Sequence, residues 1–144
     1  KKDKAQRVAG ICNAEYGSDM TGILGEANEN IDQFLDEVDV VFATAAAGVQ
    51  VLNKEQVQKA SRLKVAADVN AVPPTGIAGM DVMDDAVEIS GSTSGAVGIG
   101  ALAIGNVKYQ TQHILLQRMR ESDEPVYYHF EHAFEVAREY VSKN

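Results

Sequence analysis

Two short apolar runs in this chain each end in a loop of small or turn-forming residues, and a helix-forming segment separates them. Residues 38–44 (VDVVFAT) and 63–69 (LKVAADV) are rich in β-branched and apolar residues, as buried strands of a parallel sheet are. Residues 53–61, between the two runs, have helical character. A strand–helix–strand order is typical of an α/β fold with parallel neighbouring strands. We expect residues 38–44 to form a central strand of the sheet.

Helical and extended segments also precede these two strands. The spacing of apolar residues predicts a first helix from Asp3, its expected N-cap, to Gly17. A short strand is expected at residues 19–23. A second helix is expected at residues 29–37, with a buried stripe of four apolar residues: Ile31, Phe34, Leu35 and Val38.

The second half of the chain begins with a segment that cannot be regular. Residues 70–77 include Pro73 and Pro74, which remove two backbone donors and fix φ. Residues 91–105 are rich in glycine, alanine and serine but carry apolar side chains, so we expect a tightly packed strand and turn. A helix is expected at residues 106–121. After a break, the chain ends in an amphipathic helix with an apolar stripe of Phe130, Phe134, Ala137 and Val141.

Composition excludes several classes of protein. The 144 residues suffice for one domain with a hydrophobic core, and a hydrophobic fraction of 45% argues against disorder. A net charge of −8 disfavours nucleic-acid binding. No apolar stretch is long enough to span a bilayer, so no membrane partner is expected. Cys12 is the sole cysteine, which agrees with a reducing cytoplasm.

A nucleotide-binding α/β sheet normally opens with a strand and a glycine-rich turn that holds the pyrophosphate. No G-x-G-x-x-G motif precedes the first helix, and the nearest match, residues 95–100 (GAVGIG), lacks the required spacing. The sequence therefore predicts an α/β fold with a Rossmann-like parallel sheet and flanking helices, lacking its first strands and glycine-rich loop.

Four segments carry a resemblance to a known family. Residues 68–79 (DVNAVPPTGIAG) and 100–108 (GALAIGNVK), with residues 3–6 and 44–49, resemble the methylene-tetrahydromethanopterin dehydrogenase family. Its members are NAD(P)-dependent enzymes of bacterial one-carbon metabolism. The resemblance implies that residues 1–122 are a partial Rossmann NAD(P)-binding domain. It also implies that residues 123–144 form a C-terminal helix that packs back or toward a substrate domain missing from this chain.

The resemblance implies an oxidoreductase that converts methylene-tetrahydromethanopterin to the methenyl form by direct hydride transfer to NADP, with NAD also possible as cofactor. The partner would be a small-molecule pterin, and the fragment alone would be inactive. Separately from the resemblance, an acidic surface and Gly/Ala-rich helices favour a homo-oligomer. Two alternatives stay open: a methylene-tetrahydrofolate dehydrogenase, and a dinucleotide-binding module without turnover.

Site residues implied by the resemblance gather at the ends of strands. Lys4 matches a basic position that accommodates the 2′-phosphate of NADP, although a solvated lysine is the simpler reading. Asn70 can offer a donor and an acceptor to the nicotinamide carboxamide, or hold its own loop. The other expected cofactor-binding residues are small and would contact the dinucleotide mostly through backbone or form a wall of the nicotinamide pocket: Thr44, Ala45, Ala46, Gly48, Ala71, Pro73, Gly98 and Gly100.

The charged candidates on the later helices are weaker. Lys108 is a candidate pterin-side residue, but an ammonium there would oppose the cation that forms when the methylene carbon is oxidised. Gln110 stands where many relatives have a second lysine. No residue is therefore assigned a catalytic role. His129 and His132 have a spacing that metals can use, but a solvated helix face is the favoured reading, so no metal is expected.

Overall fold

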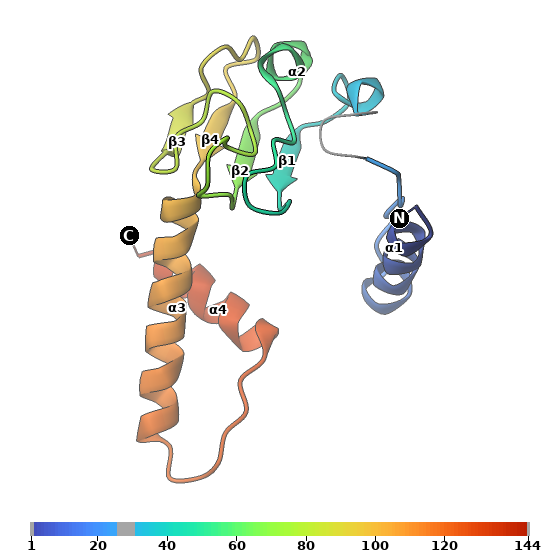
Figure 1. The fold of residues 1–144 in the computed structure, drawn as a ribbon. Coiled ribbons are helices and arrows are strands. Elements are labelled where there is room, and N and C mark those ends of the chain that lie inside the picture. Colours follow the sequence, from blue (N-terminus) through green and yellow to red (C-terminus); the bar gives the residue numbers. More distant parts are fainter. Residues whose placement is uncertain (1, 26–30, 144) are drawn as a thin grey trace.

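The computed structural model describes residues 2–25 and 31–143. The chain forms a small α/β unit in which the last strand of the sheet is followed by two helices that extend away from it (Figure 1). The described elements follow one another along the chain in this order: α1 (Lys2–Tyr16), a 3-10 turn η1 (Asp32–Phe34), β1 (Val40–Ala43), α2 (Lys54–Lys59), β2 (Val65–Asp68), β3 (Asp85–Glu88), β4 (Val97–Ile99), α3 (Ala101–Glu121) and α4 (Phe130–Val141).

The sheet has four described strands in the spatial order β1-β2-β4-β3. β1 pairs in parallel with β2, and β2 pairs in parallel with β4, so the carboxyl ends of these three strands share one edge. β3 runs antiparallel to β4 and was not expected from the sequence. The Rossmann-like α/β prediction is confirmed, but the sheet is mostly rather than wholly parallel.

The core lies between the sheet and the segments that connect its strands. Leu52, Leu63, Ile77 and Ile89 are all almost fully buried in it. The expected helix between the first two strands is confirmed as α2, and Asn53 caps it. The side chain of Asn53 accepts a hydrogen bond from the backbone N–H of Gln56, whose side chain in turn accepts from the Asn53 N–H.

The prediction of a central strand at residues 38–44 is wrong in one respect. The strand exists as β1, but it lies at an edge of the described sheet. Phe42 is 74% exposed and Val40 is 48% exposed. An apolar, β-branched run predicts a strand well, but it does not say how many neighbours the strand has.

Several local predictions also need correction. Residues 19–23 form no strand in the described part of the chain. The helix expected at residues 29–37 is a single 3-10 turn followed by a hydrogen-bonded turn, although Leu35 is buried as expected. Residues 29 and 30 lie outside the described residues. Asp3 lies within the first turn of α1 rather than at its N-cap.

α3 begins at Ala101, five residues before its predicted start, because Gly100 already serves as its N-cap. It runs away from the carboxyl edge of the sheet, and α4 packs beside it (Figure 1). α1 stands apart from the sheet in the same view. No helix in the described ranges combines the length and the apolar character that crossing a lipid bilayer requires.

Candidate functional site

Two loops follow the parallel strands β1 and β2 and meet at the carboxyl edge of the sheet. Residues 44–49 follow β1, and residues 69–76 follow β2. The backbone N–H of Val69 donates to the carbonyl of Ala43 at 3.2 Å, so the loops start side by side. Ligands of open α/β sheets bind at this edge, outside the carboxyl ends of the strands.

Asn70 joins the two loops. Its side-chain oxygen accepts hydrogen bonds from the backbone N–H of Gly48 at 3.1 Å and of Val72 at 2.9 Å. Its amide nitrogen donates to the carbonyl of Pro74 at 2.8 Å. Asn70 is only 5% exposed. Of the two roles considered for this residue, the geometry describes the one in which the amide holds its own loop.

Asp68, the last residue of β2, belongs to the conspicuous segment 68–79, but the sequence assigned it no role at the site. Its carboxylate accepts three backbone hydrogen bonds, from Asn70 at 2.9 Å, from Gly76 at 2.7 Å and from Ile77 at 3.2 Å. The side chain is 2% exposed. The available signal was an aspartate at a strand end with an asparagine two residues later, a spacing suited to holding a turn.

The loops stay together beyond Asn70. The backbone N–H groups of Val51 and Leu52 donate to the carbonyl of Gly76 at 2.6 and 3.0 Å, and the N–H of Ala78 donates to the carbonyl of Leu52 at 2.9 Å. Each loop is therefore tied to the other at its beginning and at its end. The peptide bond between Pro73 and Pro74 is cis.

The surface that the loops present is uncharged. Between residues 44–49 and 69–76 every side chain is apolar, amide or hydroxyl, and Thr44, Ala46 and Ala71 are exposed. Short side chains leave the backbone open to a flat ligand, whereas a phosphate would require cations or a helix N-terminus. The residues present therefore fit the nicotinamide and ribose part of a dinucleotide better than its phosphates.

Close packing leaves no room for a side chain at Gly98 or Gly100. A Cβ on Gly98 would lie 2.8 Å from Cε of Met80, and a Cβ on Gly100 would collide with the carbonyl oxygens of Asp81 and Val82. Close packing against residues 80–82 accounts for both glycines, whether or not a ligand also lies near them.

Lys4 lies on α1, which stands apart from the two loops (Figure 1). Its side chain is exposed. The described structure therefore does not bring Lys4 together with Thr44, Gly48 or Asn70. Lys1, a further basic residue of this segment, lies outside the described residues.

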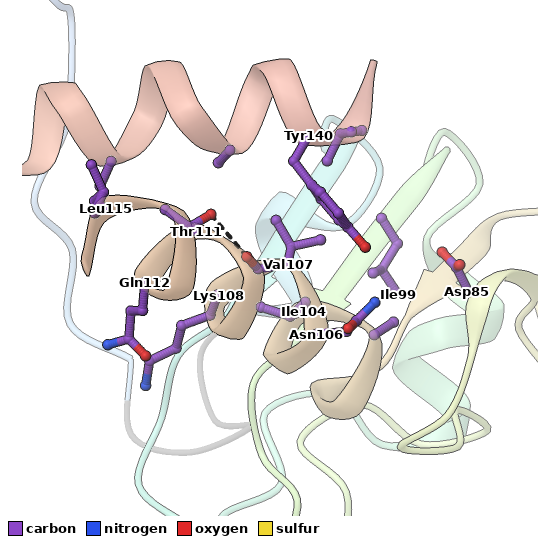
Figure 2. A pocket seen from close by; sticks show the side chains of 14 residues that line it. Asp85, Ile99, Ile104, Asn106, Val107, Lys108, Thr111, Gln112, Leu115 and Tyr140 are labelled. Carbon is purple, nitrogen blue, oxygen red and sulfur yellow. Dashed lines mark hydrogen bonds between the residues drawn. The ribbon is translucent and has the colours of Figure 1, made fainter. Parts of the chain in front are cut away.

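Lys108 lines a different region, a cleft of about 770 Å³ between α3 and α4. The cleft wall is mainly apolar, with Ile104 and Leu115 from α3. Figure 2 shows Lys108 and Gln112 pointing to the same side of α3, away from Tyr140 on α4. Because α3 begins at Ala101, Lys108 lies about 10 Å along the helix axis from its start. It is thus not on the first turn after the sheet edge.

His129 and His132 cap α4. The Nδ1 atom of His129 accepts from the N–H of Glu131 at 3.4 Å, and that of His132 accepts from the N–H of His129 at 3.3 Å. In the described part of the chain, no group of three or more histidine, cysteine, aspartate or glutamate residues is placed to hold a metal ion.

The chain is similar to two curated proteins of Methylorubrum extorquens. It is 40% identical over 138 residues to an NAD(P)-dependent methylenetetrahydromethanopterin dehydrogenase. The resemblance to this dehydrogenase family is confirmed. The chain is also 30% identical over 139 residues to the bifunctional protein MdtA of the same organism.

The match to the dehydrogenase involves nearly all of this chain but only part of the relative. In both comparisons 96% of the chain is covered, and the chain spans 46% of the length of the relative. No family profile matches the chain.

Proposed function

We propose that this chain provides the nicotinamide-binding part of an NAD(P)-dependent methylene-tetrahydromethanopterin dehydrogenase. The observation that carries the proposal is the 40% identity, over 96% of the chain, to a curated enzyme of that name. The paired loops at the carboxyl edge of the sheet support it, because a dinucleotide-binding sheet uses this edge.

In this proposal the chain binds and orients, and it supplies no acid or base. Thr44, Ala45, Ala46 and Gly48 would contact the nicotinamide ribose from one loop, and Ala71 and Pro73 from the other. NADP held by these residues would supply the hydride acceptor, and the substrate would supply the electron pair, since a ring nitrogen lone pair would form the new C=N bond as the C–H bond of the methylene carbon breaks. Holding two reactants in a fixed geometry can account for a large part of such a rate enhancement.

The preference for NADP over NAD would come from the basic segment at the start of α1. Lys4 is exposed and therefore accessible to a 2′-phosphate. Lys4→Glu should weaken the binding of NADP about tenfold and that of NAD far less, because only NADP carries the 2′-phosphate. Equal losses for both cofactors would exclude this role.

The pterin would lie on the α3 side of the site, and Lys108 is the charged residue proposed for it. Residues 123–144, which contain α4, would pack back or toward a substrate domain. Because Lys108 borders the cleft between α3 and α4, it can attract an anionic part of the substrate without facing the methylene carbon.

We further propose that the protein acts as a homo-oligomer in the cytoplasm, where a chain with Cys12 as its sole cysteine remains reduced.

The test is a chimera in which this chain replaces the matching stretch of the Methylorubrum extorquens dehydrogenase. NADPH formation is followed with methylene-tetrahydromethanopterin and, separately, with methylene-tetrahydrofolate. Turnover with the first substrate supports the proposal, and turnover with the second alone supports a folate enzyme. A folded chimera that binds NADP and turns over neither substrate would leave only the non-catalytic dinucleotide-binding module.

A further inference from the structure

We infer that Asp68 is a positioning residue for the nicotinamide end of the cofactor, acting through Asn70 on both loops of the sheet edge; the inference rests on the proposed function. Asp68 itself is 2% exposed, so it does not offer its carboxylate to a ligand. Its effect must reach the surface through the groups that it holds.

The carboxylate fixes the loop after β2 at both ends. One oxygen, Oδ1, accepts from the N–H of Asn70 at the start of the loop, and the other, Oδ2, accepts from the N–H groups of Gly76 and Ile77 at its end. The loop is thus closed around one side chain. Hydrogen bonds to an ionised acceptor are about twice as strong as those between neutral groups.

The packing at Gly76 shows how closely the loop approaches the carboxylate. A Cβ on Gly76 would lie 2.6 Å from Oδ1 of Asp68. Glycine is therefore required at position 76 for the backbone to reach the carboxylate, so the presence of Asp68 restricts which residue can occupy position 76. A looser loop would not need this restriction.

Asn70 transmits the constraint to the second loop. Its backbone is held by Asp68 at 2.9 Å, and its side chain accepts from the N–H of Gly48 at 3.1 Å. Two buried side chains therefore set the relative position of residues 44–48 and 71–74. These two stretches contain the residues that the proposed function assigns to the cofactor: Thr44, Ala45, Ala46, Gly48, Ala71 and Pro73.

Asp68→Asn is the sharpest variant because it keeps the size of the side chain and changes its hydrogen bonding. An amide has one acceptor oxygen, so its NH₂ group must face at least one of the three backbone donors. We expect the amide resonances of Gly48, Val72 and Gly76 to shift in the variant without ligand. We also expect the dissociation constant for NADPH to rise about tenfold, the effect of losing one well-formed interaction.

Ser94→Ala is the matched control. The Ser94 hydroxyl donates to the carbonyl of Leu63 at 2.6 Å, at the opposite, amino edge of the sheet. Its removal also deletes a partly buried hydrogen bond, but it should leave the NADPH dissociation constant within about twofold of the wild type. Comparison of the two variants separates positioning from a general loss of stability.

The experiment is a titration with NADPH of the labelled chimera described above, carrying either the wild-type chain or one of the two variants, followed by the amide chemical shifts of this chain's residues. Weaker binding in Asp68→Asn alone, with shifts at Gly48, supports the inference. Equal affinities for the wild type and Asp68→Asn overturn it while leaving the proposed function intact. If the wild type shows no ligand-dependent shifts at residues 44–49 and 70–76, the proposed cofactor site itself is wrong and the positioning role falls with it.

Asn70→Ala carries the same test if Asp68→Asn does not fold. It leaves the carboxylate of Asp68 and its three backbone hydrogen bonds in place and removes the contacts of the Asn70 side chain with Gly48, Val72 and Pro74. Weakened NADPH binding in this variant supports the transmission through Asn70. Unchanged binding overturns it.

Discussion

The side-chain oxygen of Asn70 lies 3.1 Å from the backbone nitrogen of Gly48 and accepts its hydrogen bond, so one buried amide joins the loops that follow β1 and β2. The same oxygen also accepts from Val72, and the amide nitrogen donates to Pro74. The proposed cofactor edge is therefore a single hydrogen-bonded unit rather than two independent loops.

Asn70→Ala should lower the free energy of unfolding by about 1–3 kcal/mol, because buried backbone partners lose their hydrogen bonds. Urea denaturation measures the change. Asn13 provides a matched control, since its side chain also makes three hydrogen bonds, to Ser18 and twice to Met20, but at an exposed site. Asn13→Ala should cost less than about 1 kcal/mol, since water replaces the lost partners. Equal losses in both variants would contradict the buried role of Asn70.

Gly100→Ala and Gly105→Ala should change stability in opposite directions. A Cβ on Gly100 would collide with the carbonyl oxygens of Asp81 and Val82, whereas one on Gly105, within α3, meets nothing within 4 Å. Overpacking at Gly100 should cost about 1–3 kcal/mol, and alanine in place of the helical Gly105 should stabilise by about 0.5–1 kcal/mol. Thermal unfolding of the two variants measures both effects. If Gly100→Ala proves neutral, packing does not explain that glycine.

Ala86→Gly should stabilise the irregular pairing of β3 with β4. The register shifts between Asp85 and Val87, and Ala86 has a φ of 57°, in the left-handed region. Residues other than glycine are strained there, so glycine should raise the free energy of unfolding by up to about 1 kcal/mol. Chemical denaturation of Ala86→Gly and Ala86→Val tests this, and the valine variant should be less stable than the wild type. A destabilising glycine would show that Ala86 is not strained.

Protonation of Asp39 should account for part of the stability that the protein loses at acid pH. The hydrogen bond from Lys64 and the charges of Arg62 and Lys64 hold the pKa of the Asp39 carboxyl below its usual value of 3.8. Because the pKa is lowered in the folded state, the pair stabilises the fold above about pH 4 and loses this effect as the pH falls through the folded pKa.

Denaturation from pH 7 to pH 2 with the wild type and Asp39→Asn checks the assignment. The stability difference between the two should be present at neutral pH and shrink once Asp39 is protonated. A difference that does not depend on pH would mean that the ion pairs do not act through the carboxylate.

β1 and β2 could be predicted because each lies in a compact apolar run with β-branched residues, followed by small or turn-forming residues. Residues 38–44 and 63–69 contain β1 and β2, and the proline-containing loop lies where expected. β3 could not be predicted in the same way. Its sequence, Asp85–Glu88, carries a charge at each end, is exposed throughout, and contains the register shift at Ala86.

The candidate site was predictable in position but not in its internal contacts. Parallel strands place their carboxyl ends at one edge, so loops with Thr44 and Asn70 were expected there. The role of Asp68 depends on the fold of the loop, since its partners Gly76 and Ile77 lie eight and nine residues further along the chain. Local spacing does not specify a contact of that kind.

The central claim is that the loops after β1 and β2 contact the nicotinamide end of NADP. Intermolecular nuclear Overhauser effects between the nicotinamide ring protons and the methyl groups of this chain test it most directly. We predict contacts with the methyl groups of Ala45, Ala46 and Ala71. Contacts instead with Ile104 and Val107, in the cleft between α3 and α4, would contradict the account.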